Sequence, residues 1–202
     1  MSTKRDEQRD RLLRAAYELI AEVGISGLRT RDIADKAGVN IATLHYCFAT
    51  KDALLTELYS YIIAMVKEER ARYINDHGTA ADKLRGHSEL RLHFLRDKPA
   101  SARAWRAFSE GVWTNGAVRE IMRRHFAEVR VKLRDIIAEG RRDGTIGPLP
   151  TDDDDLAASM LMSLYDGLIF QWVADPEGFP IEQYTSGVLA WLGLQPVPEV
   201  AV

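Results

Sequence analysis

The residues best suited to a chemical role lie on the outward side of one short predicted helix near the start of the chain. They mix polar tips with small apolar groups and do not form a row of charges. These side chains are Asn40, Ile41, Ala42, Thr43, His45 and Tyr46. Amide, hydroxyl, imidazole and methyl groups of this kind suit base edges, thymine methyl groups and phosphate oxygens. The set therefore indicates nucleic-acid recognition.

Two short helices and the start of a third must hold these side chains. Ile33, Ala34 and Ala37 follow a helical period, and Thr30 is expected to cap this first helix. Gly38 is expected to end it, because a glycine tolerates the left-handed backbone of a sharp exit.

The second short helix follows at once. Val39 is expected to fill the corner, Asn40 to cap the helix, and Leu44, Cys47 and Phe48 to face inward. Thr50 then caps a longer helix and places Lys51 beside free backbone amides, which form an anion site for one phosphate. Two helices joined by a glycine turn predict a helix-turn-helix, whose second helix enters the DNA major groove.

The segments TRDIADKAGV and VNIATLHYCFATKDALL resemble the DNA-binding signature of the TetR family of bacterial transcriptional regulators. Two positions depart from the common pattern, since His45 stands where the family commonly has Tyr and Cys47 where it commonly has His. The resemblance implies a homodimer that binds a double-stranded DNA operator. It also implies a helical body that encloses a pocket for a small-molecule effector.

The DNA contacts divide into two predicted groups. Asn40, Ile41, Ala42 and His45 are expected to contact bases, and a second group to position the helix on phosphates. This second group is Thr30, Thr43, Tyr46 and Lys51, and Arg31 and Thr50 are further expected DNA-binding residues. Thr3, Arg5 and Arg9 are further candidates for phosphate contacts, although a solvated chain end is an alternative.

Composition indicates a globular protein with one large or two modest domains. The chain has 202 residues, 46% of them hydrophobic and 28% charged, and its single cysteine excludes an internal disulfide. The net charge is −3, of which residues 1–51 carry +2 and the remainder −5. A charged N-terminal segment without a signal-peptide pattern, and Asp166 within the most apolar stretch, predict a cytoplasmic protein that does not cross a membrane.

The whole chain shows helical periodicity and no strand alternation, which predicts an all-α fold of about nine helices. A three-helix DNA-binding domain at residues 1–52 is followed by a long helix from about Thr50 to Ile74. Five further helices are expected near residues 80–96, 99–114, 117–142, 152–174 and 180–192. Residues 53–202 are expected to form the ligand-binding and dimerisation domain.

The stretch from Asp152 to Ala174 is apolar nearly all round, so it needs cover on several sides. Together with the last helix it predicts a dimer interface with a partner copy. The residues expected there are Leu156, Ser159, Met160, Ser163, Gly167, Trp172, Ile181, Tyr184, Val188 and Trp191.

Large side chains with a few polar groups between them are candidates for the effector pocket. They are Trp105, Arg106, Phe108, Ser109, Met122, His125, Phe126, Met162, Tyr165, Asp166 and Ile169. Such a lining suits a small, largely apolar ligand. Ordinary core packing is the alternative, and Asp166 is equally compatible with a structural role.

No catalytic, cofactor-binding or metal-binding motif is present, so an enzyme, a bound cofactor and a metal site are not expected. The run from Asp152 to Asp155 is interpreted as the acidic first turn of a helix. A transcriptional repressor is the favoured function. The alternatives are a ligand-dependent activator and a helical interaction module that has lost DNA binding.

Overall fold

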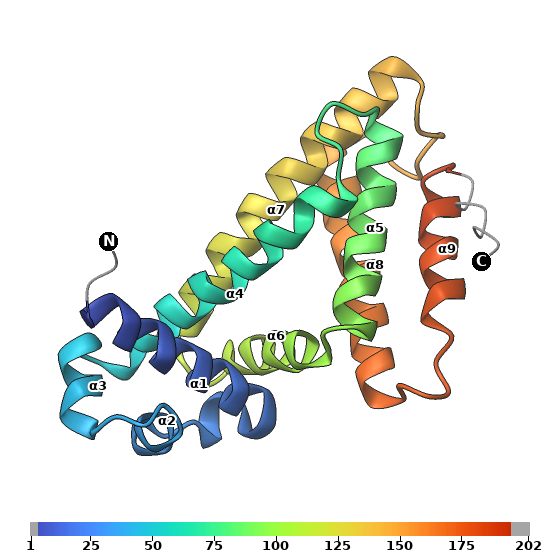
Figure 1. The fold of residues 1–202 in the computed structure, drawn as a ribbon. Coiled ribbons are helices and arrows are strands. Elements are labelled where there is room, and N and C mark those ends of the chain that lie inside the picture. The colour runs from blue at the N-terminus through green and yellow to red at the C-terminus, as the bar shows by residue number, and fades with distance from the viewer. Residues whose placement is uncertain (1–3, 195–202) are drawn as a thin grey trace. The chain divides into compact units, whose positions relative to one another are not determined.

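The computed structural model describes residues 4–194, which fold into nine helices (Figure 1). They are α1 (Lys4–Gly27), α2 (Thr30–Lys36), α3 (Ile41–Cys47), α4 (Lys51–Tyr73), α5 (Ala80–Arg96), α6 (Pro99–Gly111), α7 (Gly116–Asp143), α8 (Asp154–Ala174) and α9 (Ile181–Trp191). The predicted all-α fold is confirmed. Thr3 lies outside the described residues.

The chain forms two compact units, and neither is continuous in sequence. Unit 1 contains Met1–Glu68 and Pro99–Arg124, and unit 2 contains Glu69–Lys98 and His125–Val202. Helices α4 and α7 therefore contribute residues to both units. The functional division between residues 52 and 53 stays a prediction.

In unit 1, helix α1 packs against α2, α3 and α6. Its inner stripe includes Leu12, Ala16 and Ile20, each no more than 1% exposed. The regular helix is interrupted at Gly24, whose φ of 68° lies in the left-handed region that suits glycine. The hydroxyl groups of Tyr17 and Ser101, 2.6 Å apart, join α1 to α6. These contacts fix the base on which the two short helices rest.

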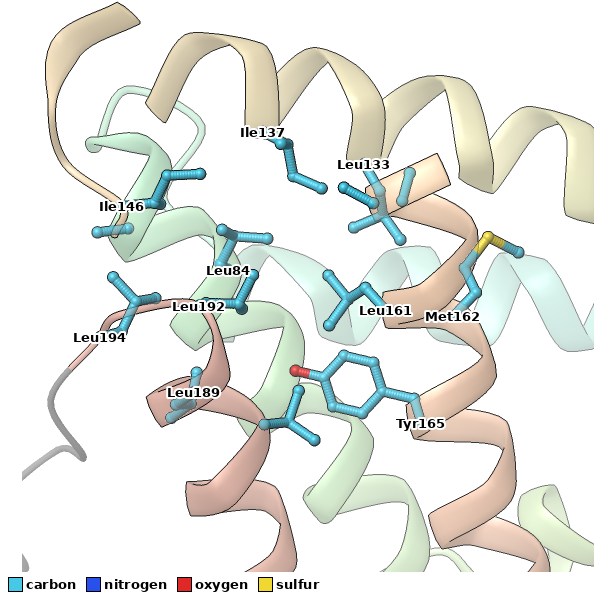
Figure 2. Close-up of a cluster of buried hydrophobic side chains, with 14 residues drawn as sticks. Leu84, Leu133, Ile137, Ile146, Leu161, Met162, Tyr165, Leu189, Leu192 and Leu194 are labelled. Atoms are coloured by element: carbon cyan, nitrogen blue, oxygen red, sulfur yellow. The ribbon is translucent and has the colours of Figure 1, made fainter. Parts of the chain in front are cut away.

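The core of unit 2 is an apolar cluster drawn from α5, α7, α8, α9 and the loop after α7 (Figure 2). Leu84, Ile137 and Leu161 lie near its centre and are at most 1% exposed. Figure 2 shows the Tyr165 ring among the same side chains. The Tyr165 hydroxyl is hydrogen-bonded to the Ser88 hydroxyl on α5, so this ring joins the apolar core to a polar cluster.

Helix α8 begins in the acidic run, as the sequence predicted. The Asp153 carboxylate accepts a hydrogen bond from the Leu156 backbone N–H over 3.0 Å, and Asp154 and Asp155 occupy the first turn. Arg141 lies 3.3 Å from the Asp154 carboxylate. Acidic groups at this end stabilise the positive pole of the helix dipole.

The expectation that Asp166 keeps the α8 stretch from being long and apolar enough to span a bilayer was wrong. By length and composition alone, Asp154–Ala174 is apolar enough to cross a membrane, in spite of Asp166. Asp166 is one charge in a window that is otherwise mostly apolar, so it does not disqualify the helix. Within unit 2, however, α8 packs against α9 and contributes Leu161 and Tyr165 to the core, as a core helix of a globular protein does.

Candidate nucleic-acid interface

The first short helix, α2, is anchored by Ile33 and Ala34, which are at most 1% exposed. It begins at Thr30, so Arg29 occupies the cap position and makes no side-chain cap. The prediction that Thr30 caps this helix was therefore wrong. Thr30 lies one residue inside the helix, where its own backbone is already helical. Arg31 is exposed on the first turn.

The turn between the two short helices has the geometry that the sequence predicted. Gly38 has a φ of 67°, and the Val39 N–H donates to the Ala34 carbonyl over 3.0 Å. This bond closes a glycine-terminated helix end and satisfies a carbonyl that the helix itself leaves free. Val39 is half-buried in the corner.

The recognition helix candidate, α3, is capped and seated as predicted. The Asn40 side chain accepts hydrogen bonds from the Thr43 backbone N–H over 2.8 Å and from the Thr43 hydroxyl over 2.9 Å. Leu44, Cys47 and Phe48 are buried, with exposed fractions of 5% or less. The side-chain oxygen of Asn40 and the hydroxyl of Thr43 thus take part in hydrogen bonds that cap α3. The amide nitrogen of Asn40 is not used by this cap.

The opposite side of α3 is open to solvent. Tyr46 is 67% and Ile41 40% exposed, and Ala42 and His45 are exposed beside them. The exposed tyrosine and isoleucine on this seven-residue helix are not stabilised by burial in the chain's own core. The structure therefore brings the predicted base-contacting residues together on one face.

Thr50 and Lys51 stand at the start of α4. The Thr50 hydroxyl accepts a hydrogen bond from the Ala53 N–H over 3.0 Å, which confirms the predicted cap. The Lys51 ammonium donates to the Ile25 carbonyl over 3.2 Å. That bond ties α4 to the end of α1, and an ammonium group with three donors can still bind a phosphate.

Two arginines of α1 approach α3 in different ways. The Arg9 guanidinium donates to the Cys47 carbonyl over 2.9 Å, forms an ion pair with Glu57 and lies over the Phe48 ring. Arg5 lies over the exposed Tyr46 ring, 5.0 Å from its centre. Arg9 thus has an internal role that the sequence interpretation missed. The sequence indicated this role in one way, because Arg9 shares a face of α1 with the apolar residues Leu13, Ala16 and Ile20.

Comparison with known proteins agrees with this geometry. The family model for bacterial regulatory proteins of the tetR family matches residues 12–58, which include α2 and α3. The model for the C-terminal part of BetI-type transcriptional repressors matches residues 80–194, more than half of the chain. The chain belongs to the TetR family.

Individual relatives support the same assignment. The regulator BetI of Stenotrophomonas maltophilia is 30% identical over 50% of this chain, and the match spans 52% of that relative, about half its length. The nicotine-responsive repressor HdnoR of Paenarthrobacter nicotinovorans is 22% identical over 84% of this chain and 86% of its own. A Saccharomonospora viridis regulator solved in complex with choline has the same fold, with a TM-score of 0.80, 23% identity and coverage of 93% of this chain and 96% of its own.

The residues predicted for an effector pocket of this TetR-family chain lie in both units. In unit 1, Phe108 and Met122 are 1% exposed and fully packed, with the Phe108 ring edge-on to Tyr59. Ser109 donates to the Trp105 carbonyl over 3.1 Å, and Arg106 pairs with Glu110 over 2.6 Å. These polar groups are thus engaged within α6 itself.

In unit 2 lie the remaining candidates, His125, Phe126, Met162, Tyr165, Asp166 and Ile169. Met162 and Tyr165 belong to the apolar core, and Phe126 packs against it. Burial is the first cause that lowers the pKa of His125 to about 4, and the positive charges of Arg91 and Lys132 add to it. Burial raises the pKa of Asp166, an effect that Arg91 opposes.

A separate recess of about 400 Å³ lies in unit 2 where α8 ends and α9 begins. Trp172 and Ile181, two predicted dimer residues, line it together with Phe179, Glu177 and Arg96. Arg96 forms an ion pair with Glu182, also at this recess, over 3.4 Å. This recess does not involve the residues predicted for the effector.

The predicted dimer residues of the regulator differ in exposure. Leu156 is 49% and Tyr184 48% exposed, and Ser163 and Gly167 are also open to solvent. Ser159, Met160, Trp172 and Trp191 are half-buried. Ile181 and Val188 are at most 5% exposed, because they pack inside the chain. The accessible part of the set is therefore on α8 and at Tyr184.

Proposed function

We propose that this TetR-family chain is a transcriptional repressor that binds a palindromic operator as a homodimer. A small, largely apolar effector bound in the C-terminal part releases it from DNA. The observation that carries the DNA-binding part is the open face of α3, where Tyr46 and Ile41 are exposed on a helix whose other side is buried. In a helix-turn-helix, this is the helix that enters the major groove.

The surface of α8 supports the dimer. Leu156, Met160, Ser163, Gly167 and Phe170 follow one another at intervals of four and three residues, so they share one face. Phe170 is 68% exposed on that face. Leaving such a stripe in water is costly, and a two-fold axis through it would bury it against its own copy. The same two-fold axis would present two α3 helices to two half-sites of an operator.

Relatives support the remaining parts of the proposal. The names of BetI-type repressors and of the nicotine-responsive HdnoR describe repressors. The choline in the Saccharomonospora regulator supports a small-molecule site in a chain of this fold, without fixing the class of molecule that this chain binds. By analogy, residues 53–202 hold the effector and the dimer contacts, and residues 1–52 bind DNA. Because an operator is a chromosomal or plasmid sequence, we place the protein in the cytoplasm.

Selection of bound duplexes from a random DNA pool tests the proposal. We expect an enriched palindrome whose half-sites are separated by about one helical turn, roughly 34 Å, or a multiple of it. Enrichment of a single unpaired half-site would contradict the dimer, and no enrichment would favour an interaction module that has lost DNA binding. A reporter gene placed behind the selected operator would distinguish a repressor from an activator.

A further inference from the structure

A polar cluster interrupts the apolar interior of unit 2 where α5 faces α8. Ser88 and Tyr165 are 1% and 4% exposed, and their hydroxyl groups are hydrogen-bonded to each other. The Arg91 guanidinium lies over the Tyr165 ring, 4.6 Å from its centre. The Asp166 carboxylate lies 3.8 Å from the same guanidinium.

Arg91 already occupies the place that an organic cation would need. Proteins bind such cations against the face of an aromatic ring and near a carboxylate. Here the ring of Tyr165 and the carboxylate of Asp166 both face Arg91. A positively charged effector would have to displace a guanidinium that belongs to the chain itself, so this cluster disfavours cations.

The contact between Arg91 and Asp166 leaves the donors of Arg91 available. A charge-assisted hydrogen bond between these groups would measure roughly 2.7–2.9 Å, and the observed separation is 3.8 Å. The guanidinium offers five N–H donors in a planar fork that fits a carboxylate with two parallel bonds. The side chains of Arg91 and Asp166 are 28% and 33% exposed, so an incoming group can reach them.

The charges around His87, one turn before Arg91 on α5, add positive potential. Besides Arg91, the charges that act on His87 are those of Arg70, Lys132 and Asp76. Arg70 and Asp76 form an ion pair over 2.5 Å, so Lys132 is the added positive charge. Burial, followed by these cations, lowers the pKa of His87 to about 4, so its ring is neutral at pH 7. The cluster thus holds an excess of positive charge next to apolar side chains.

We propose that Arg91 recognises the carboxylate of an apolar, anionic effector and that Asp166 is an internal competitor which holds the guanidinium until that effector binds. Met162 and the half-buried Ile169, one turn to either side of Asp166 on α8, would contact the apolar part of the molecule. The inference rests on the proposed function, because it names the class of effector that the regulator responds to.

The test compares three probes with a straight chain of eight carbons, the carboxyl carbon of octanoate included, and different head groups: octanoate, octanol and octyltrimethylammonium. Calorimetric titration of each into the full chain should place octanoate first, by about tenfold or more over the other two, because a charge-assisted pair at Arg91 is available to it alone. Arg91→Gln should remove this preference and leave octanol binding unchanged. Asp166→Asn should strengthen octanoate binding several-fold, since the competitor loses its charge.

Arg96→Gln is the matched control, because Arg96 lies on the same helix, is 52% exposed and pairs with Glu182. It should leave the order of the three probes unchanged. Tighter binding of octyltrimethylammonium, failure of all three probes to bind, or an equal effect of Arg91→Gln and Arg96→Gln would each overturn the inference.

The same samples separate this inference from the proposed function. If octyltrimethylammonium binds tightest and releases the selected operator, the repressor proposal stands and the anionic effector is wrong. If octanoate binds through Arg91 but leaves operator affinity unchanged, the recognition site stands and release by this class of ligand is wrong.

Discussion

The Arg9 guanidinium donates a hydrogen bond to the Cys47 carbonyl oxygen over 2.9 Å, which joins α1 to the last residue of the recognition helix. That carbonyl lies at a helix end, where it has no partner within the helix. The same guanidinium pairs with Glu57 on α4 and lies over Phe48. One side chain therefore holds three elements of unit 1 together and sets the orientation of α3.

Replacing Arg9 with Met should destabilise the chain by about 1–2 kcal/mol, because the half-buried guanidinium makes one hydrogen bond and one ion pair. Operator affinity should also fall, since α3 loses its connection to α1. Thermal unfolding and a DNA titration would measure both effects. Arg11→Met, at an exposed position of the same helix, is the control and should change neither. Equal behaviour of the two variants would contradict the role of Arg9.

Gly38 should not tolerate a side chain, although there is room for one. A Cβ atom at this position meets nothing within 4 Å, so any cost comes from the φ of 67°. Gly38→Ala should cost about 1 kcal/mol, the penalty of a left-handed conformation for an L-residue. Gly116→Ala is the matched control, because its Cβ would also meet nothing within 4 Å and its φ is not positive. A similar unfolding midpoint for both variants would show that the turn is not strained.

The two groups of predicted DNA contacts should respond differently to substitution. Lys51→Ala should weaken binding to every duplex and reduce the slope of log affinity against log salt by about 0.9 per subunit, the loss of one phosphate contact. Ile41→Ser should leave that slope unchanged and alter the preferred base pair, with a discrimination of about 1–3 kcal/mol. Binding isotherms at several salt concentrations would measure both. An unchanged salt slope for Lys51→Ala would show that Lys51 serves only the Ile25 carbonyl.

Helical periodicity predicted most of the fold, because most helices have an apolar stripe and a recognisable end. The ranges expected for α4 and α5 agree with Lys51–Tyr73 and Ala80–Arg96 to within one residue. The caps at Asn40 and Thr50 were predictable for the same reason, since local hydrogen bonds depend on nearby residues alone. The prediction that Thr30 caps α2 was wrong because Arg29 and Thr30 are adjacent and either could precede the first helical turn.

Long-range partners were not predictable from the sequence. Arg9 with Glu57 and Arg91 with Asp166 are separated by 48 and 75 positions, and no periodic pattern couples such pairs. The position of a charged residue on a buried stripe was the only signal, as for Arg91 between Ser88 and Leu95 on α5. That signal predicts burial but does not name the partner.

The exposed face of α8 predicts how the proposed dimer can be disrupted. Phe170→Glu should convert the dimer to a folded monomer and lower operator affinity by at least about tenfold, because charge would have to be buried between copies. Light scattering after gel filtration and circular dichroism would measure assembly and folding. Trp113→Glu is the matched control, since Trp113 is 84% exposed on the loop before α7. A dimer that survives Phe170→Glu would place the interface elsewhere.

Stability should depend on pH through His87 and His125. Both have a pKa of about 4 in the folded chain, lowered from the ordinary value of 6.5 mainly by burial. Between these values the unfolded chain binds more protons, so the free energy of unfolding rises as the pH increases from about 4 to 6.5 and is level above it. Each histidine should contribute about 3 kcal/mol to this change. Urea unfolding at several pH values should show a shallower dependence for His87→Gln and an unchanged one for His77→Gln, at an exposed position of the loop before α5. Parallel pH profiles for the wild type and His87→Gln would show that His87 takes up protons equally in the folded and unfolded chain.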